Sequence, residues 1–177
     1  VRGYRGNQPL CLIVGCHSPH VYWEENSGLD PARVTIPPNH VDTAETRIWR
    51  TRYYTDIQRM DQQLGQVHRS TMEALGDNTL FTYMADNGAQ WPLAKWSLYD
   101  DGIRLPMVTS WPAGPKQARR SDAMISTADF LPTFLDLAGG AAPVGLDGRS
   151  FAPLLLGKTG KHRDRIYAHH AADGKMN

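Results

Sequence analysis

The sequence has little that would tie it to a disulfide framework, a membrane or a nucleic acid. Its 2 cysteines, Cys11 and Cys16, lie in or beside one apolar segment, where a strand would point them to opposite faces. We expect both to be small buried residues that do not pair, and the redox compartment stays open. The net charge of +1 gives no electrostatic reason to expect a nucleic-acid partner. No apolar run approaches the ~20 residues of a membrane span, and no signal peptide opens the chain.

The signatures of several enzyme classes are missing as well. There is no Gly-x-Ser-x-Gly, which disfavours an α/β-hydrolase, and no Gly-rich phosphate loop of Walker or Rossmann type. Cys16 beside His17 makes a poor catalytic dyad, because neighbouring residues on an extended strand face opposite ways. The 7 histidines lack a ligand spacing beside cysteines, which disfavours zinc. The chain therefore offers no convincing nucleophile.

What the chain does contain is the composition of a globular domain, with 41% hydrophobic and 21% charged residues among its 177. The apolar pattern predicts alternating strands and helices. The expected strands are 10–15, 79–85, 103–109 and 165–169, and the expected helices are 43–75, one that starts at 126–129, and 150–156. This alternation is typical of a layered α/β fold with a largely parallel sheet, here as a single domain over residues 1–177.

The predicted long helix carries signals at both ends. Asp42 is expected to cap its first turn, with Glu45 as the capping-box partner, and Gly76 to end it in the left-handed conformation. The arginines of its polar face, Arg50 among them, are interpreted as solvated. In the later helix, Pro132 fits only within the first turn.

Polar side chains follow two of the predicted strands at the points where the strands end. His17 and His20 come after the first strand, and Asp86 and Asn87 come directly after the strand at 79–85. In a parallel sheet both ends lie on the same edge, so these side chains are expected to converge in one crevice.

The segment around Asp86 has the chemistry of a metal and anion site. Asp86 offers a carboxylate, Asn87 a carbonyl oxygen, and Gly88 permits a sharp turn or a close approach to a ligand. Lys95, seven residues after Gly88, is placed to hold an anion. Calcium takes 6–8 oxygen ligands, so further carboxylates are needed, and Asp100-Asp101 is interpreted as a cap or turn instead. Taken alone, the four residues Ala85–Gly88 favour a plain turn over a metal site.

Six segments, in their order along the chain, carry a family resemblance. They are Gly15–His20, Tyr53–Gly65, Phe81–Gly88, Lys95–Pro106, Asp129–Gly139 and Asp147–Ser150. Together they resemble the sulfatase family within the alkaline phosphatase-like superfamily. The resemblance implies a layered α/β/α fold, here incomplete, and a periplasmic or secreted protein that acts on a sulfated small molecule or glycan.

The resemblance also implies roles for individual residues. Asp86 and Asn87 are expected to be two of four Ca²⁺ ligands. Lys95 and His20 are expected to contact the sulfate, and one of the two, with His20 favoured, is expected to protonate the leaving group. His17 is interpreted as a loop histidine without a role. Together, the Ca²⁺ ion, the Lys95 ammonium and the His20 imidazolium would neutralise the negative charge that develops on the sulfuryl group during its transfer.

The chain departs from the family pattern in its nucleophile. The family makes a formylglycine from the cysteine of Cys-x-Pro-Ser-Arg, and that motif is absent, since Cys16–His20 has Ser and Pro in swapped order and no Arg. The family's N-terminal pair of acidic calcium ligands is absent too. The chain, which starts at Val1 rather than at methionine, is therefore expected to be a central-to-C-terminal fragment. It should hold half a metal site and be inactive alone.

Two alternatives stay open beside the sulfatase interpretation. One is a phosphonate or phosphodiester hydrolase of the same superfamily, which shares the Asp86-Asn87 segment. The other is a non-catalytic module that binds sulfated glycans through Trp23, Trp91 and Trp96, although such aromatics also serve as packing or loop anchors.

Overall fold

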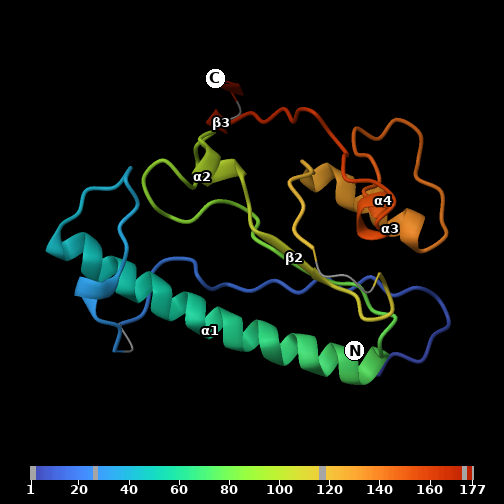
Figure 1. Ribbon diagram of the computed structural model, residues 1–177, viewed down its shortest axis with the longest axis horizontal. Helices are drawn as coiled ribbons and strands as arrows, with labels where there is room; N and C mark the ends of the chain where they lie inside the picture. The colour runs from blue at the N-terminus through green and yellow to red at the C-terminus, as the bar shows by residue number, and fades with distance from the viewer. Residues whose placement is uncertain (1–2, 26–27, 116–118, 173–174, 177) are drawn as a thin grey trace. The chain divides into compact units, whose positions relative to one another are not determined.

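The computed structural model describes residues 3–25, 28–115, 119–172 and 175–176 (Figure 1). These residues form short 3₁₀ segments, helices and strands in the order η1 Pro31–Arg33, α1 Ala44–Leu75, β1 Phe81–Met84, α2 Asp100–Ile103, β2 Met107–Ser110, η2 Thr127–Asp129, α3 Phe130–Leu137, α4 Ala152–Leu155, β3 Ala171–Ala172 and β4 Lys175–Met176.

The chain divides into two compact units by its contacts. The first unit comprises Val1–Ile13, Ala74–Thr82 and Thr109–His169. The second comprises Val14–Glu73, Tyr83–Val108 and His170–Asn177. All four residues predicted to carry chemistry belong to the second unit.

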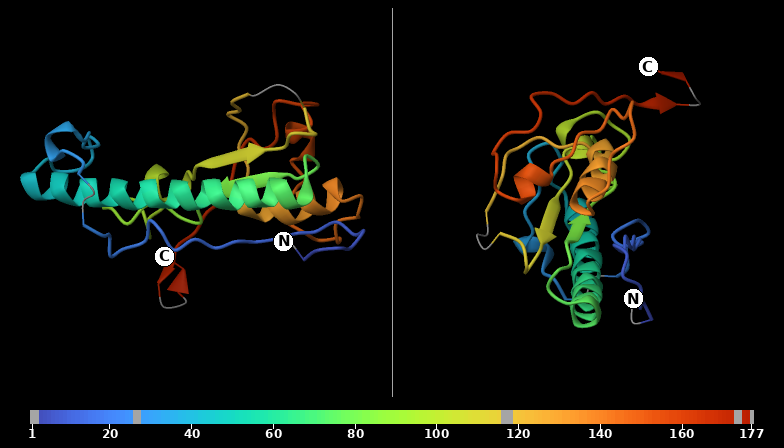
Figure 2. Two further views of the ribbon diagram at one scale, coloured as in Figure 1. Left: turned by 90° about the horizontal axis from the view of Figure 1, so that it is seen from below. Right: turned by 90° about the vertical axis from the view of Figure 1, so that its right-hand side faces the viewer.

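The long helix α1 confirms the predicted 43–75 helix and runs without interruption in both views of Figure 2. Its N-terminus differs from the prediction. The Thr43 hydroxyl accepts a hydrogen bond from the Thr46 amide at 3.1 Å, so Thr43 is the capping residue. Asp42 was predicted for that role, but its carboxylate instead accepts two hydrogen bonds from the Arg47 guanidinium, at 2.6 and 2.7 Å. At the other end Gly76 has φ +74°, as predicted.

The polar face of α1 is not uniformly solvated. Arg50 is only 5% exposed and Asp56 only 4%, so the prediction of a solvated face is wrong at these positions. Arg50 is covered by aromatic rings, with its guanidinium carbon 3.9 Å from the centroid of Trp91. The helix also buries Thr51 completely, and the Thr51 hydroxyl donates to the Ile48 carbonyl at 2.7 Å.

The strands β1 and β2 form a two-stranded sheet. The Ala85 amide donates to the Pro106 carbonyl at 3.3 Å beyond one end of the pair, and the Ala113 amide donates to Asp77 at 3.0 Å beyond the other. These bonds join the end of one strand to the start of the other, so the strands are antiparallel. The second sheet pairs β3 with β4, also antiparallel, in the register Ala171 to Met176. The described residues therefore do not bear out a largely parallel sheet.

The predicted strand at 10–15 is absent, and the segment is irregular backbone. Leu12 is 50% exposed and Ile13 88% exposed. An apolar run becomes a buried strand only when neighbouring strands take its backbone hydrogen bonds, and none of the described residues does so. Cys11 and Cys16 are free, as predicted, but they are exposed rather than buried for the same reason.

Of two other predicted strands, one has a later start and the other is absent. The strand expected at 103–109 begins only at Met107, because the helix α2 extends through Ile103 and Pro106 has no amide hydrogen for a ladder. The strand expected at 165–169 is irregular.

In the helical part of the first unit, the helices begin and end where the capping, proline and glycine residues predict. The Ser126 hydroxyl and the Asp129 carboxylate form a reciprocal capping box at η2, which continues into α3. Pro132 lies in the first turn of α3, and Gly139 follows the helix with φ +76°. The predicted helix at 150–156 is α4.

A buried carboxylate organises this helical part. Asp129 is completely buried, and its oxygens accept hydrogen bonds from the Arg149 amide at 2.7 Å, the Ser126 amide at 2.8 Å and the Arg163 Nε at 2.9 Å. His162 Nε2 lies 3.1 Å from the same carboxylate. Burial by itself would raise the pKa of Asp129, but the hydrogen bonds from Arg163 and these other donors outweigh it and hold the pKa far below its usual value.

Candidate functional site

The predicted metal ligands Asp86 and Asn87 lie in the turn that follows β1. Asp86 is exposed and Asn87 is half-buried. The Asn87 amide nitrogen donates to Asp86 Oδ1 at 3.2 Å and to the Gly88 carbonyl at 3.3 Å. This arrangement orients the amide nitrogen inward along the turn. The Asn87 carbonyl oxygen and Asp86 Oδ2 accept no hydrogen bond from the described residues, so both oxygens are available to a cation.

Two glycines fasten this turn to the segment that contains Lys95. The Gly88 amide donates to the Gly102 carbonyl at 3.1 Å. A Cβ at Gly88 would lie 2.2 Å from the Asp101 carbonyl oxygen, and a Cβ at Gly102 would lie 2.5 Å from that of Ala94. Any side chain at either position would push the two backbones apart. The sequence interpretation gave Gly88 a sharp turn or a close approach to a ligand, whereas the close approach in the structure is to the backbone of Asp101 and Gly102.

Lys95 is held by its backbone in the same loop. Its amide donates to the Ala89 carbonyl at 2.9 Å, and its side chain is half-buried. The flanking residues Leu93 and Trp96 have φ of 62° and 68°, which is the left-handed region that non-glycine residues rarely adopt. Among the described residues none forms an ion pair with Lys95, so its ammonium group is free for an anion.

His20 lies in a tight turn together with His17. The His20 amide donates to the His17 carbonyl at 3.0 Å, and the two imidazole rings are 5.2 Å apart. His20 Nδ1 is 2.7 Å from the Val21 carbonyl oxygen. Because a carbonyl oxygen can only accept, Nδ1 carries the hydrogen and Nε2 is left to exchange a proton. The same turn therefore presents two imidazoles, of which the sequence interpretation favoured one.

The predicted site residues are brought together to different degrees. Asp86 and Asn87 touch, and Lys95 joins them through the backbone of their loop. The His20 turn comes close through its neighbours, since Trp23 stacks on Trp91 with ring centroids 4.9 Å apart. No hydrogen bond joins the His20 side chain to the other three in the described part of the chain.

The donor set fits part of a calcium site. Carboxylate and amide oxygens are ligands that Ca²⁺ prefers, but a pair of residues cannot supply its full coordination. Across the described ranges, no group of three or more His, Cys, Asp or Glu side chains could hold a metal ion. Nearby acids are engaged elsewhere, because Asp101 accepts from Asn39 at 3.1 Å and Asp100 pairs with Arg104 at 3.3 Å.

A cationic and aromatic cluster near this loop was missed by the sequence interpretation. The Arg50 guanidinium is 2.6 Å from His40 Nδ1 and lies over the ring of Trp91. Burial lowers the pKa of Arg50, against a smaller opposing effect of Tyr54 and Tyr53. The signal available in the sequence was the pair of tyrosines three and four residues after Arg50, which places aromatic rings beside it on the helix.

The comparisons with known proteins agree with one another. The family described as Sulfatase matches residues 3–141. An ulvan-active sulfatase of Formosa agariphila is 32% identical over 163 residues, which are 90% of this chain and 32% of that relative.

Two solved structures extend the comparison to the fold. A protein solved in complex with its substrate, D-glucosamine-2-N,6-O-disulfate, has a TM-score of 0.61 at 24% identity, over 77% of this chain and 30% of that one. A phosphonate monoester hydrolase from Silicibacter pomeroyi has a TM-score of 0.54 at 25% identity, over 78% and 28%. The first likeness concerns the fold alone. The chain spans about a third of the length of these proteins. No helix within its described ranges is long and apolar enough to cross a membrane.

Proposed function

Because the chain belongs to the sulfatase family, as its sequence resemblance predicted, we propose that it supplies part of the active site of a calcium-dependent sulfatase. The reaction is hydrolysis of sulfate esters or sulfamates, with sulfated carbohydrates as substrates and the periplasm or cell exterior as the site of action. The observation that carries the proposal is the Gly88–Gly102 contact, which fastens the turn of Asp86 and Asn87 to the loop of Lys95.

In this proposal one loop binds both the Ca²⁺ ion and the anionic sulfate group of the substrate. Asp86 Oδ2 and the Asn87 carbonyl oxygen would hold Ca²⁺ together with ligands from outside this chain. Bound there, the cation supplies positive charge against the sulfuryl oxygens. The ammonium group of Lys95 holds the anionic sulfate from the same loop, which is consistent with its lack of an ion-pair partner among the described residues.

His20 is proposed to donate the proton that the leaving group needs. Its Nδ1–H is held by the Val21 carbonyl, which orients the ring, so that in the imidazolium form Nε2 carries the proton that passes to the leaving group. His17 shares the turn, so the assignment has to be tested at both positions. The nucleophile, expected to be a formylglycine, lies outside these residues, and we expect the 177-residue chain to release no sulfate from an aryl sulfate by itself.

The test is a calorimetric titration of the purified 177-residue chain with Ca²⁺, and then with p-nitrophenyl sulfate in the presence of Ca²⁺. Asp86→Asn should weaken Ca²⁺ binding, and Lys95→Ala should weaken aryl sulfate binding by roughly tenfold, the effect of one lost charge-assisted hydrogen bond. Lys158→Ala, which removes an exposed lysine of the first unit, is the matched control and should bind normally. Equal affinities for the wild-type chain and both site variants would refute the proposal.

A second candidate function is the hydrolysis of phosphonate monoesters, favoured by the likeness to the Silicibacter pomeroyi enzyme. The same loop would then hold a phosphonate in place of a sulfate. Titration with phenyl phenylphosphonate against p-nitrophenyl sulfate separates the two. Tighter binding of the sulfate ester that depends on Lys95 supports the sulfatase, whereas tighter binding of the phosphonate supports the alternative.

A further inference from the structure

The loop that contains Lys95 has a strained backbone, and Trp91 is part of the turn that holds it. The Ala89 carbonyl accepts two hydrogen bonds, from the Trp91 amide at 2.7 Å and from the Lys95 amide at 2.9 Å. Leu93 and Trp96, on either side of Lys95, have φ of 62° and 68°. Such conformations persist only where the surrounding structure holds them, so the position of Lys95 depends on what anchors Trp91.

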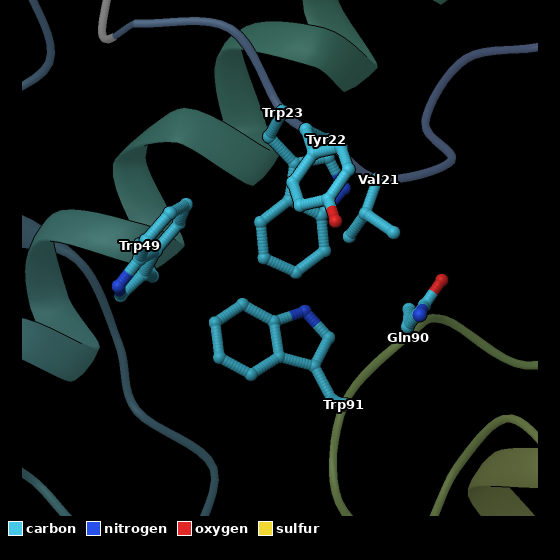
Figure 3. Close-up of a pocket in the computed structure, with 6 residues that line it drawn as sticks. All are labelled: Val21, Tyr22, Trp23, Trp49, Gln90 and Trp91. Carbon is cyan, nitrogen blue, oxygen red and sulfur yellow. The ribbon is translucent and has the colours of Figure 1, made fainter.

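The side chain of Trp91 is held by packing rather than by hydrogen bonds. It extends from the loop toward Trp23, on which it stacks with ring centroids 4.9 Å apart (Figure 3). Its Nε1 is buried and has no hydrogen-bond partner within the described part of the chain. The groups that pack against the ring therefore fix the loop at this point.

Arg50, on the helix α1, is one of these groups. Its guanidinium carbon is 3.9 Å from the centroid of the Trp91 ring, well inside the ~6 Å within which an aromatic face attracts a cation. Arg50 Nη2 is 2.6 Å from His40 Nδ1, which accepts, because a guanidinium can only donate. The His40 ring itself stacks on Trp91 at 5.5 Å. Arg50 thus holds Trp91 both directly and through His40.

The burial of Arg50 is not explained by stability. The side chain is 5% exposed, and among the described residues no carboxylate pairs with it. Burying a charge without an opposite charge destabilises a fold, and apolar side chains of similar volume often serve stability better than buried charged groups. The arrangement therefore indicates a role in placing Trp91.

We propose that Arg50 is a positioning residue for the anion site: from α1 it fixes the Trp91 ring, and through Trp91 it keeps the Lys95 loop in its binding conformation. The inference rests on the proposed function, in which the ammonium group of Lys95 binds the sulfate. Because Arg50 is buried, it acts through Trp91 and not by contact with the substrate. When the loop leaves the binding conformation, the apparent affinity for an anion falls with the fraction of molecules that keep it.

The first measurement is a calorimetric titration of the 177-residue chain with p-nitrophenyl sulfate in the presence of Ca²⁺. Arg50→Met replaces the cation by an apolar side chain. It should weaken aryl sulfate binding about fivefold to tenfold and leave Ca²⁺ binding at Asp86 and Asn87 unchanged. Arg50→Lys keeps a positive charge beside the ring and should recover part of the affinity. Arg52→Met is the matched control and should bind normally, because it removes a cation–π contact, 4.9 Å from Trp49, that lies within α1.

The second measurement, amide hydrogen exchange without any anion, follows the loop itself. In Arg50→Met the Lys95 amide, which donates to Ala89, should exchange about fivefold to tenfold faster than in the wild type. The Gly88 amide, which donates to the Gly102 carbonyl, should keep its rate. Should Arg50→Met fail to fold, Trp91→Phe carries both measurements with the same expected directions, because it shrinks the ring that Arg50 holds.

The outcomes separate this inference from the proposed function. Unchanged exchange at Lys95 together with unchanged aryl sulfate binding in Arg50→Met overturns the positioning role. Equal losses of Ca²⁺ and aryl sulfate binding, or equally faster exchange at Gly88 and Lys95, overturn it as well, because they indicate a general loosening. If the wild-type chain binds no aryl sulfate through Lys95 but the Lys95 amide is protected only when Arg50 is present, the proposed function fails and the positioning of the loop stands.

Discussion

Each of the two units contains an aspartate with a structural or chemical role, Asp129 at the end of η2 and Asp86 in the turn after β1, and the two carboxylates are used in opposite ways. Asp129 in the first unit is completely buried and accepts hydrogen bonds from two arginines, a serine amide and a histidine. Asp86 in the second unit is exposed, and its carboxylate accepts a hydrogen bond from the neighbouring Asn87 amide at 3.2 Å. A buried carboxylate must be paired, since an unpaired buried charge is costly. The carboxylate of Asp129 is therefore fully engaged within the protein, whereas that of Asp86 can bind a ligand.

The packing around Asp129 differs from that around Asp86 in the same way. Around Asp129, the Thr133 hydroxyl donates to the Asp129 carbonyl at 2.6 Å and accepts from the Phe151 amide at 2.8 Å, so α3 and α4 share one buried network. Around Asp86, the tight contact is between two glycine backbones, Gly88 and Gly102. The first arrangement stabilises helices, and the second shapes a loop while leaving its side chains free. Substitutions at the two aspartates should therefore give opposite phenotypes.

The largest expected effect is at Asp129. Asp129→Ala leaves the Arg163 guanidinium without its buried partner, which should cost about 3–5 kcal/mol in the free energy of unfolding. Urea denaturation, with amide hydrogen exchange at Phe151 as a local probe, measures the loss. Asp122→Ala, at an exposed aspartate of the same unit, should change the stability by less than about 0.5 kcal/mol. Equal effects of the two substitutions would show that the Asp129 network does not stabilise the unit.

Acid should weaken the same network. The pKa of Asp129 is lowered by folding, so its contribution to stability is fully present above the unfolded value of ~3.9 and is lost as the pH falls from there toward the folded value. The urea midpoint of the wild type should therefore drop between about pH 4 and pH 2. Asp129→Asn, which cannot titrate, should be less stable at pH 6 and show a flatter profile. Parallel profiles for the two proteins would contradict this account.

The next effect is at the contact between the glycines. Gly88→Ala places a Cβ 2.2 Å from the Asp101 carbonyl oxygen, an overlap with backbone that cannot be relieved by a side-chain rotation. We expect a loss of about 1–3 kcal/mol in stability, together with weaker binding of Ca²⁺ and aryl sulfate. Gly15→Ala is the matched control in the same unit, since nothing lies within 4 Å of its Cβ. Unchanged ligand binding in Gly88→Ala would show that the loop does not need this contact.

A smaller effect on stability is expected at Asp86. Because its side chain is exposed, Asp86→Asn should change the unfolding free energy by less than about 0.5 kcal/mol. Excess Ca²⁺ should raise the Tm of the wild type, since a ligand that binds the folded state stabilises it, and should raise that of the variant by less. A Tm shift of the same size in both proteins would mean that the cation binds elsewhere.

The features that the sequence predicted well are those set by local chemistry. The helix α1, the left-handed Gly76, and Pro132 in a first turn all depend on residues that are near one another in the sequence. The need for a glycine at position 88 was predicted from its backbone freedom, but its actual neighbour, the backbone of Asp101 and Gly102, was not. The assignment of Asp86 and Asn87 as ligands rests on the same local chemistry and stays a prediction.

The features that the sequence predicted poorly depend on partners that are distant in the sequence. The apolar run at 10–15 has the composition of a buried strand, but a strand also needs neighbours that accept and donate its backbone hydrogen bonds. The position of Arg50 on the polar face of α1 predicts an exposed side chain. In the structure the ring of Trp91, from a loop some forty residues later in the sequence, covers its guanidinium group. The antiparallel pairing of β1 and β2 likewise arises because α2 is a short turn of helix rather than a long crossover.

The smallest effect we predict distinguishes two neighbouring candidates for the cap of α1. The Thr43 hydroxyl accepts from the Thr46 amide at 3.1 Å, so Thr43→Ala should lose about 1 kcal/mol of stability. Asp42 pairs with Arg47 at the surface, where such a pair contributes about 0–1 kcal/mol, so Asp42→Ala should cost less. The two losses can also be told apart by salt, because screening weakens the ion pair and leaves the cap unaffected. A loss in Asp42→Ala that exceeds that of Thr43→Ala and persists in 0.5 M NaCl would return the capping role to Asp42.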